Sequence, residues 1–232
     1  MKNLILCSVL LCLLSACSSE SDFEPAESFN KNSAEITKDS VFPLSPTNPF
    51  DAKGRKYYDI VQSYSNLYNR PNSIEEIRRQ ISFLAQQYKR NDNHKSANLG
   101  YTTEEIAAIL DNPSVMLLEI VENCPISAAS KSELLLFVQT LIAEQDEEYV
   151  TIRDYIISFD AGIIANTTLL VDEKETILTV STISSYALYA EAERKDRDWE
   201  TSVGTRHAKI FFNNNQAPII TIIALLNIVV KQ

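Results

Sequence analysis

The sequence predicts an all-α protein with a single helical domain of six or seven amphipathic helices. Apolar residues recur every three or four positions through most of the chain after residue 48, which is the period of a helix face. Capping pairs and Asn–Pro dipeptides divide these segments and leave short connections between them. Alternating strand patterns are almost absent, so the segments are expected to pack as a helical bundle.

The first two helices have distinct starts. Asn48 and Pro49 form a good N-cap and first-turn pair, so the first helix is expected over residues 48–69. Ser73 and Glu76 form a capping box for the second helix, because the hydroxyl accepts from an amide while the carboxylate reaches back. The apolar stripe of the second helix comprises Ile74, Ile77, Ile81, Leu84 and Tyr88.

Five further helices follow, with capping residues or prolines at their ends. They are expected at residues 102–110, 114–123, 130–142, 149–163 and 172–195. Asn112 and Pro113 separate the first two of these. Capping pairs mark three of the starts, namely Thr102 with Glu105, Ser130 with Glu133, and Asp172 with Glu175. The stretch Ile177–Ile183 is rich in β-branched residues, which leaves a strand open at that point.

The N-terminus has the composition of a signal peptide. Residues 1–16 combine Lys2 with an apolar run at positions 4–14, which is too short for a membrane span of roughly 20 residues. The sequence Leu14-Ser15-Ala16-Cys17 that ends this segment resembles the lipobox of bacterial lipoproteins. The resemblance implies that residues 1–16 are removed and that Cys17 carries lipid with palmitate-type acyl chains. A plain secretory signal cut at the same small residues is the alternative.

Residues 17–47 are expected to form a lipidated flexible tether, because Ser, Glu, Asp and Pro dominate and no apolar period is present. Ser18, rather than an aspartate, follows Cys17. By the sorting rule of enterobacterial-type lipoproteins this implies the outer membrane. The acidic stretch at 20–24 resembles the surface-export tags of other Gram-negative groups, so a periplasmic and a surface-facing position both stay open.

Charge and cysteine content restrict the partners. The formal charge of −10 becomes −11 once residues 1–16, which contain Lys2 and no acid, are removed. Such a surface repels polyanions, so nucleic acid is excluded as a partner and membrane attachment is expected through the lipid on Cys17. Two of the four cysteines lie in the signal and Cys17 would carry lipid, so no intramolecular disulfide is expected. We expect Cys124 to be a core residue, and a reactive or intermolecular thiol is the alternative.

Catalytic and metal-binding patterns are absent or incomplete in the sequence. The four glycines are widely separated, which excludes Gly-rich phosphate loops and dinucleotide fingerprints. His94 and His207 each lack a second ligand at helical spacing. Asp196, Asp198 and Glu200 alternate as calcium-loop ligands do, but the turn glycine is missing. We therefore expect no catalytic, cofactor-binding or metal-binding residue and no cofactor.

The helical domain is expected to span residues 48–200 and to be followed by an apolar tail over 201–232. The segment Ala217–Val230 is dense in isoleucine and valine and contains no charge, so it must be buried as a strand, a core helix or a partner contact. Lys209–Phe212 could pair with it in a small C-terminal β-hairpin. A shifted reading frame near Gly204 is the alternative explanation for the change in composition.

Two segments resemble a group of uncharacterised helical lipoproteins of Gram-negative bacteria. They are residues 48–58, which begin Asn-Pro-Phe-Asp, and residues 185–199, which end Lys-Asp-Arg-Asp-Trp. The resemblance implies a helical fold and export but no reaction. We therefore expect a membrane-anchored, non-enzymatic binding or structural module, with a protein as its partner. The alternatives are an immunity-like lipoprotein that neutralises a basic toxin and a carboxylate-dependent cell-envelope hydrolase.

Overall fold

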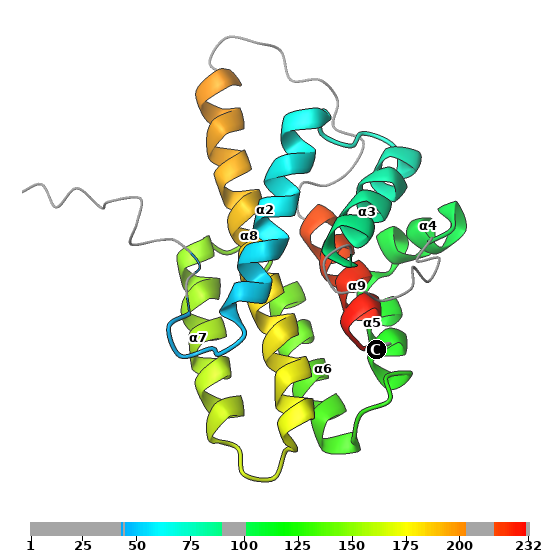
Figure 1. Ribbon diagram of the computed structural model, residues 1–232. Helices are drawn as coiled ribbons and strands as arrows, with labels where there is room; N and C mark the ends of the chain where they lie inside the picture. Colours follow the sequence, from blue (N-terminus) through cyan, green and yellow to red (C-terminus); the bar gives the residue numbers. More distant parts are fainter. Residues whose placement is uncertain (1–42, 44, 90–100, 203–215, 231–232) are drawn as a thin grey trace, which may run out of the picture. The chain divides into compact units, whose positions relative to one another are not determined.

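The computed structural model describes residues 43, 45–89, 101–202 and 216–230, drawn in colour in Figure 1. Within these ranges the chain forms eight α-helices and no strand, which confirms the all-α prediction. The helices are α2 (Asp51–Leu67), α3 (Ile74–Lys89), α4 (Thr103–Asp111), α5 (Pro113–Glu122), α6 (Ala128–Ala143), α7 (Tyr149–Ala165), α8 (Val171–Ser202) and α9 (Gln216–Val230). All of them belong to one compact unit, Lys38–Gln232.

Helix α8 is the central element of this unit. It packs against α2, α6, α7 and α9, and α2 crosses it in Figure 1. Every residue from Ile177 to Ala187 is buried, including a serine- and threonine-rich run that keeps the helix thin. Residues 177–183, whose β-branched content was compatible with a strand, are therefore helical, and other helices enclose them on several sides.

The short-range start signals of two helices are confirmed. The Thr102 hydroxyl accepts from the amide of Glu105 at 3.1 Å, and the Glu105 carboxylate accepts from the amide of Thr102 at 2.8 Å. At α3 the Ser73 hydroxyl accepts from the amide of Glu76 at 3.3 Å. The Glu76 carboxylate reaches one residue further back than predicted, to the amide of Asn72. Each of these contacts lies within one turn, so the local sequence determines it.

Two predicted starts are wrong by a few residues. Helix α6 begins at Ala128, because the hydroxyl of Ser127 caps it by accepting from the amide of Ser130 at 3.3 Å. Helix α8 begins at Val171, and Glu173, rather than Asp172, accepts from the amide of Leu170 at 3.2 Å. Several capping residues stand close together at both sites, and the tertiary packing selects among them.

The start of α2 is also later than predicted. The helix begins at Asp51, with Phe50 at the N-cap, so Asn48 does not cap it directly. Instead the Asn48 side-chain oxygen accepts from the amide of Phe50 at 2.9 Å in a tight turn before the helix. Ser45 and Asn48 are both buried, so the packed body begins before the expected boundary at residue 48.

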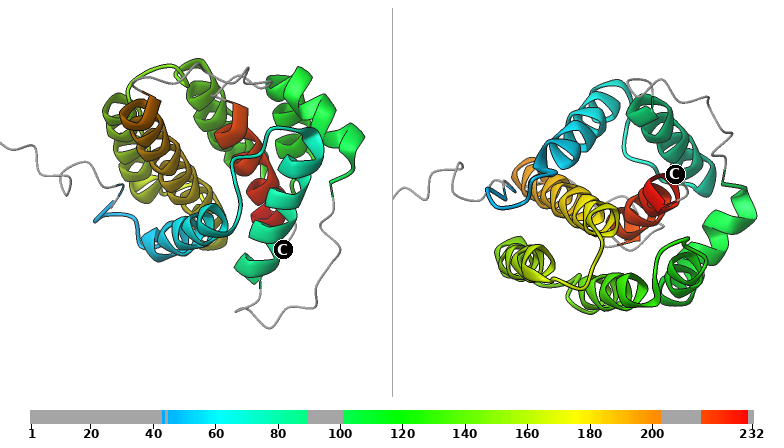
Figure 2. Two further views of the ribbon diagram at one scale, coloured as in Figure 1. Left: turned by 90° about the horizontal axis from the view of Figure 1, so that it is seen from above. Right: turned by 60° about the horizontal axis from the view of Figure 1, so that its bottom comes forward.

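The apolar tail forms α9, an eighth helix that the predicted count of six or seven did not include. Residues 216–230 are helical, so the C-terminal hairpin is not confirmed; its proposed partner, residues 209–212, lies outside the described residues. Figure 2 shows α9 (red) among the other helices, and it packs against α3, α4, α5 and α8. Its buried residues are Ile219, Ile220, Ile222, Ile223, Ala224, Leu225 and Leu226. The prediction that this charge-free segment is buried is therefore confirmed for these residues.

None of the described helices is both long and apolar enough to cross a bilayer.

Gly54 lets α2 approach α8 closely, and an alanine there should be destabilising. A Cβ atom at Gly54 would lie 2.3 Å from the Thr182 hydroxyl oxygen and 2.8 Å from the Thr182 carbonyl oxygen. We expect Gly54→Ala to lower the free energy of unfolding by roughly 1–3 kcal/mol through overpacking. Gly162→Ala is the matched control, because nothing lies within 4 Å of its Cβ and the helix should gain roughly 0.5–1 kcal/mol. Urea unfolding of both variants measures the difference, and equal effects would contradict the close approach.

Candidate functional site

A buried carboxyl group, Asp160 of α7, lies at the centre of the most extensive polar network among the described residues. Its side chain is completely buried, and both of its oxygens accept hydrogen bonds from other side chains. Ser181 of α8 donates to Oδ1 at 2.5 Å. Asn48 and Ser45, which precede α2, donate to Oδ2 at 2.9 Å and 3.3 Å. Asp160 therefore joins three separate segments of the chain.

A second acid, Asp51, is connected to the first through Ser45. The backbone amide of Ser45 donates to Asp51 Oδ1 at 3.1 Å, while its hydroxyl donates to Asp160. The hydroxyl of Tyr186 on α8 donates to Asp51 Oδ2 at 3.1 Å. Two carboxyl groups thus lie near each other where the N-terminal segment meets α7 and α8, a juxtaposition that the sequence spacing did not reveal.

Tyrosines extend this network along α8. The ring centroids of Tyr58 and Tyr186 lie 6.1 Å apart, and Tyr189 lies 5.7 Å from Tyr58 and 5.5 Å from Tyr149. The Tyr149 and Ser185 hydroxyls share a hydrogen bond of 3.3 Å. The pKa of Tyr149 is raised, mainly because burial disfavours the phenolate. The Tyr149 hydroxyl is therefore a neutral hydrogen-bonding group at ordinary pH.

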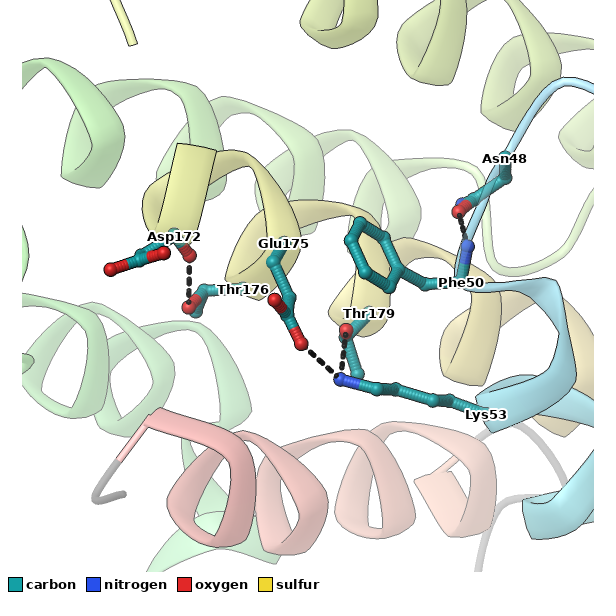
Figure 3. Close-up of polar contacts among 7 residues, drawn as sticks. All are labelled: Asn48, Phe50, Lys53, Asp172, Glu175, Thr176 and Thr179. Atoms are coloured by element: carbon teal, nitrogen blue, oxygen red, sulfur yellow. Dashed lines mark hydrogen bonds and ion pairs between the residues drawn. The ribbon is translucent and has the colours of Figure 1, made fainter. Parts of the chain in front are cut away.

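The outer edge of the network joins the start of α2 to the start of α8 (Figure 3). The Lys53 ammonium lies 2.8 Å from the Glu175 carboxylate and donates to the Thr179 hydroxyl at 3.3 Å. It also lies 5.1 Å from the centre of the Phe50 ring. Both charged side chains are partly exposed, so this ion pair contributes at most about 1 kcal/mol. It fixes the position of α2 more than it stabilises the fold.

Burial limits the reactions in which the Asp160 carboxyl group could take part. Burial raises the pKa of the Asp160 carboxyl, and the hydrogen bonds from Ser181, Asn48 and Ser45 partly offset that rise. A general acid or base must come within hydrogen-bond distance of a substrate. Because both Asp160 oxygens accept from internal donors and the side chain has no exposed surface, the group can support the fold but cannot reach a bound molecule in this conformation.

Most residues considered above as lipidation or metal-binding candidates lie outside the described part of the chain. These are Cys17 and both histidines, His94 and His207, together with the side chains of Asp196, Asp198 and Glu200. Cys124 is described, and the prediction that it is a core residue is confirmed: it is buried, and its thiol lies 3.1 Å from the carbonyl oxygen of Ile120. Among the residues that the structure describes, no group of three or more His, Cys, Asp or Glu could hold a metal ion.

The sequence reasoning missed Asp160, although a signal was present. Ile152, Ile156 and Ile163 form the apolar stripe of α7, and Asp160 lies on the same face, four residues after Ile156. An acid in an apolar stripe is expected to be buried and to need partners. Those partners could not be named, because Ser45 and Asn48 are 115 and 112 positions away in the sequence.

Comparison with known proteins adds no assignment to this geometry. No protein-family model, no curated protein and no solved structure matches this chain.

Proposed function

We propose that this chain is a lipoprotein anchored to the outer membrane through Cys17, and that its helical domain is a non-enzymatic binding or structural module. The lipobox Leu14-Ser15-Ala16-Cys17 supports the anchor. The complete burial of Asp160, the central carboxyl group of the network, supports the non-enzymatic part of the proposal. Two neighbouring carboxyl groups are what a carboxylate-dependent hydrolase would use, yet here they bind internal donors and hold the N-terminal segment on α7 and α8.

The anchor is tested by Cys17→Ser, which removes the thiol that would carry the lipid. We expect the variant to accumulate as an unprocessed or soluble precursor, because neither acylation nor the lipoprotein-specific cleavage can proceed without that thiol. Fractionation of the envelope and the mass of the product measure both effects. Cys124→Ser is the matched control and should be processed normally. A Cys17→Ser protein found in the membrane at the wild-type level, with the normal mature mass, would overturn the anchor.

A basic protein is the partner chemistry with the most support, in line with an immunity-like role. Residues 101–130, which include α4 and α5, contain no Lys or Arg. All acids of this segment have exposed side chains, namely Glu104, Glu105, Asp111, Glu119 and Glu122. We call these five residues together the α4–α5 acidic face; the Lys131 ammonium, which donates to the Glu122 carbonyl oxygen, borders it. Such a face favours a positively charged partner through attraction at long range, and salt should weaken that attraction.

Affinity capture of the lipidated protein from its native envelope tests the binding role. The informative variant replaces Glu104, Glu119 and Glu122 by glutamine. Its matched control replaces three exposed acids elsewhere with the corresponding amides and changes the net charge equally, at Asp59, Glu147 and Asp172. We expect a basic partner that is lost with the first variant and kept with the second. A partner that both variants retain would contradict the α4–α5 acidic face as the binding surface.

A further inference from the structure

The turn between α7 and α8 exposes large apolar side chains in a segment without charge. We call residues 163–171 the hairpin tip. Ile164, Leu170 and Val171 are 38%, 69% and 78% exposed. No charged residue occurs in the hairpin tip, although charged residues make up 22% of the chain. Exposed apolar side chains that gather in a charge-free turn are a candidate contact surface, because contiguous apolar patches mark interaction sites.

The hairpin tip is held in place from within. Ile163 and Leu169 are buried and pack with Ile177 and Leu178 in a small apolar cluster separate from the main core. The amide and the hydroxyl of Thr168 both donate to the side-chain oxygen of Asn166, at 2.9 Å and 2.7 Å. The turn thus satisfies polar groups locally, while its outer aliphatic side chains stay exposed.

The chain enters the helical body at the same end of α8 as the hairpin tip. Phe50 packs against the apolar cluster formed by Ile163, Leu169, Ile177 and Leu178. Lys53, one turn later, bonds to Glu175 at the start of α8, as Figure 3 shows. Residues 18–42 separate Cys17 from the first described residue, and a chain of that length can extend to no more than roughly 85 Å. A lipid on Cys17 and the hairpin tip can therefore reach one membrane surface.

We propose that the hairpin tip docks into the interface of the bilayer to which Cys17 is anchored, through Ile164, Leu170 and Val171. This inference rests on the proposed lipid anchor. The tip itself contains no charged residue, although the Lys174 ammonium donates to the Ile164 carbonyl oxygen at 2.8 Å and the exposed Asp172 follows Val171. The mature chain carries a charge of −11, so the contact fits uncharged headgroups and acyl chains rather than anionic lipid. The anchor makes docking intramolecular, and a few side chains are then sufficient to orient the domain.

A reporter at Thr167, an exposed residue of the hairpin tip, tests the docking. The lipidated protein is labelled at Thr167→Cys with an environment-sensitive dye and reconstituted into phosphatidylcholine vesicles. Cys124 is buried and Cys17 is acylated, which directs the dye to the new thiol. We expect a blue shift and protection from iodide quenching that high salt leaves intact. The same dye at Ser114→Cys, exposed at the start of α5, should show neither effect.

Matched variants separate docking from a general change in the surface. Leu170→Ser with Val171→Ser should abolish the blue shift of the dye at position 167. Val115→Ser with Leu136→Ser should keep it, although these side chains are also exposed, by 60% and 59%. A lipidated protein that floats with the vesicles but shows no blue shift would overturn the docking and leave the anchor standing. Absence of lipid in the intact mass would instead overturn the anchor.

A second copy of the chain is the other occupant that the experiment can reveal. Sedimentation of the protein without lipid or vesicles would then show a dimer that the Leu170→Ser, Val171→Ser variant converts to a monomer. That outcome would assign the hairpin tip to self-association and would contradict membrane docking. A blue shift that high salt abolishes would also contradict it, because apolar insertion does not depend on attraction between charges.

Discussion

Asp160→Ala is expected to lower the free energy of unfolding by roughly 2–4 kcal/mol, with a fall in melting temperature of roughly 5–15 °C. The carboxyl group is completely buried and accepts from Ser181, Asn48 and Ser45. An alanine leaves these donors without their acceptor in a site that water does not reach. Asp154→Ala is the control on the same helix, because Asp154 is exposed and lies no closer than 3.8 Å to Arg153. Equal unfolding curves for the two variants would contradict the role of the network.

The pH dependence of stability identifies the carboxyl group itself. Burial raises the pKa of Asp160 above its value in the unfolded chain. The group's stabilising contribution is then fully present below the unfolded pKa and is lost as the pH rises through the folded pKa. Asp160→Asn cannot titrate at this position. The free energy of unfolding of the wild type minus that of Asp160→Asn should therefore decrease with rising pH, and an increase would contradict burial as the dominant cause.

Deletion of residues 205–232 is expected to abolish the cooperative unfolding transition. The deletion removes α9, which places seven side chains in the core between α3, α5 and α8. Six of the seven are isoleucine or leucine, and each contributes roughly 1.5–3 kcal/mol when buried, so together they contribute roughly 9–18 kcal/mol. That is as large as the roughly 5–15 kcal/mol by which a domain is usually stable. Circular dichroism and heat denaturation measure the effect. An unchanged melting curve would mean that α9 is a passenger segment.

A point variant makes the same test without removing a helix. Ile223 is completely buried, so Ile223→Ala should cost roughly 2–5 kcal/mol through lost burial and the cavity that remains. Leu136→Ala is the control, because Leu136 is an exposed aliphatic residue on α6 and its loss should change stability by no more than about 0.5 kcal/mol. Similar effects for both would place α9 outside the core.

The features of this fold that the sequence predicts are those determined by residues close together in the chain, such as helix caps. Thr102 and Glu105 cap α4 as expected because both groups lie within one turn, and Pro113 separates α4 from α5 because it lacks an amide proton. At α6, Ser127 and Ser130 are both suitable N-cap residues, and Ser127 caps the helix, not Ser130 as predicted. The apolar stripe of α3, by contrast, was read correctly from its spacing.

The part that could not be predicted depends on contacts between distant residues. The isoleucines of α9 favour a strand by intrinsic preference, yet the segment is a helix that α3, α5 and α8 enclose. The role of Asp160 became clear only from the tertiary structure, in which Ser45 and Asn48 donate hydrogen bonds to it. The candidate site therefore required the tertiary structure, whereas the proposed lipid anchor at Cys17 comes from the sequence alone.

The intact mass of the protein purified from its native envelope is the most direct test of the central claim, that the chain is a lipid-anchored module. The account predicts a polypeptide that begins at Cys17, with added mass for a thioether-linked diacylglycerol and an acyl group on the new N-terminus. Mild base should then release the ester-linked acyl chains. A mature chain that begins at another residue, or one that begins at Cys17 without lipid, would contradict the claim.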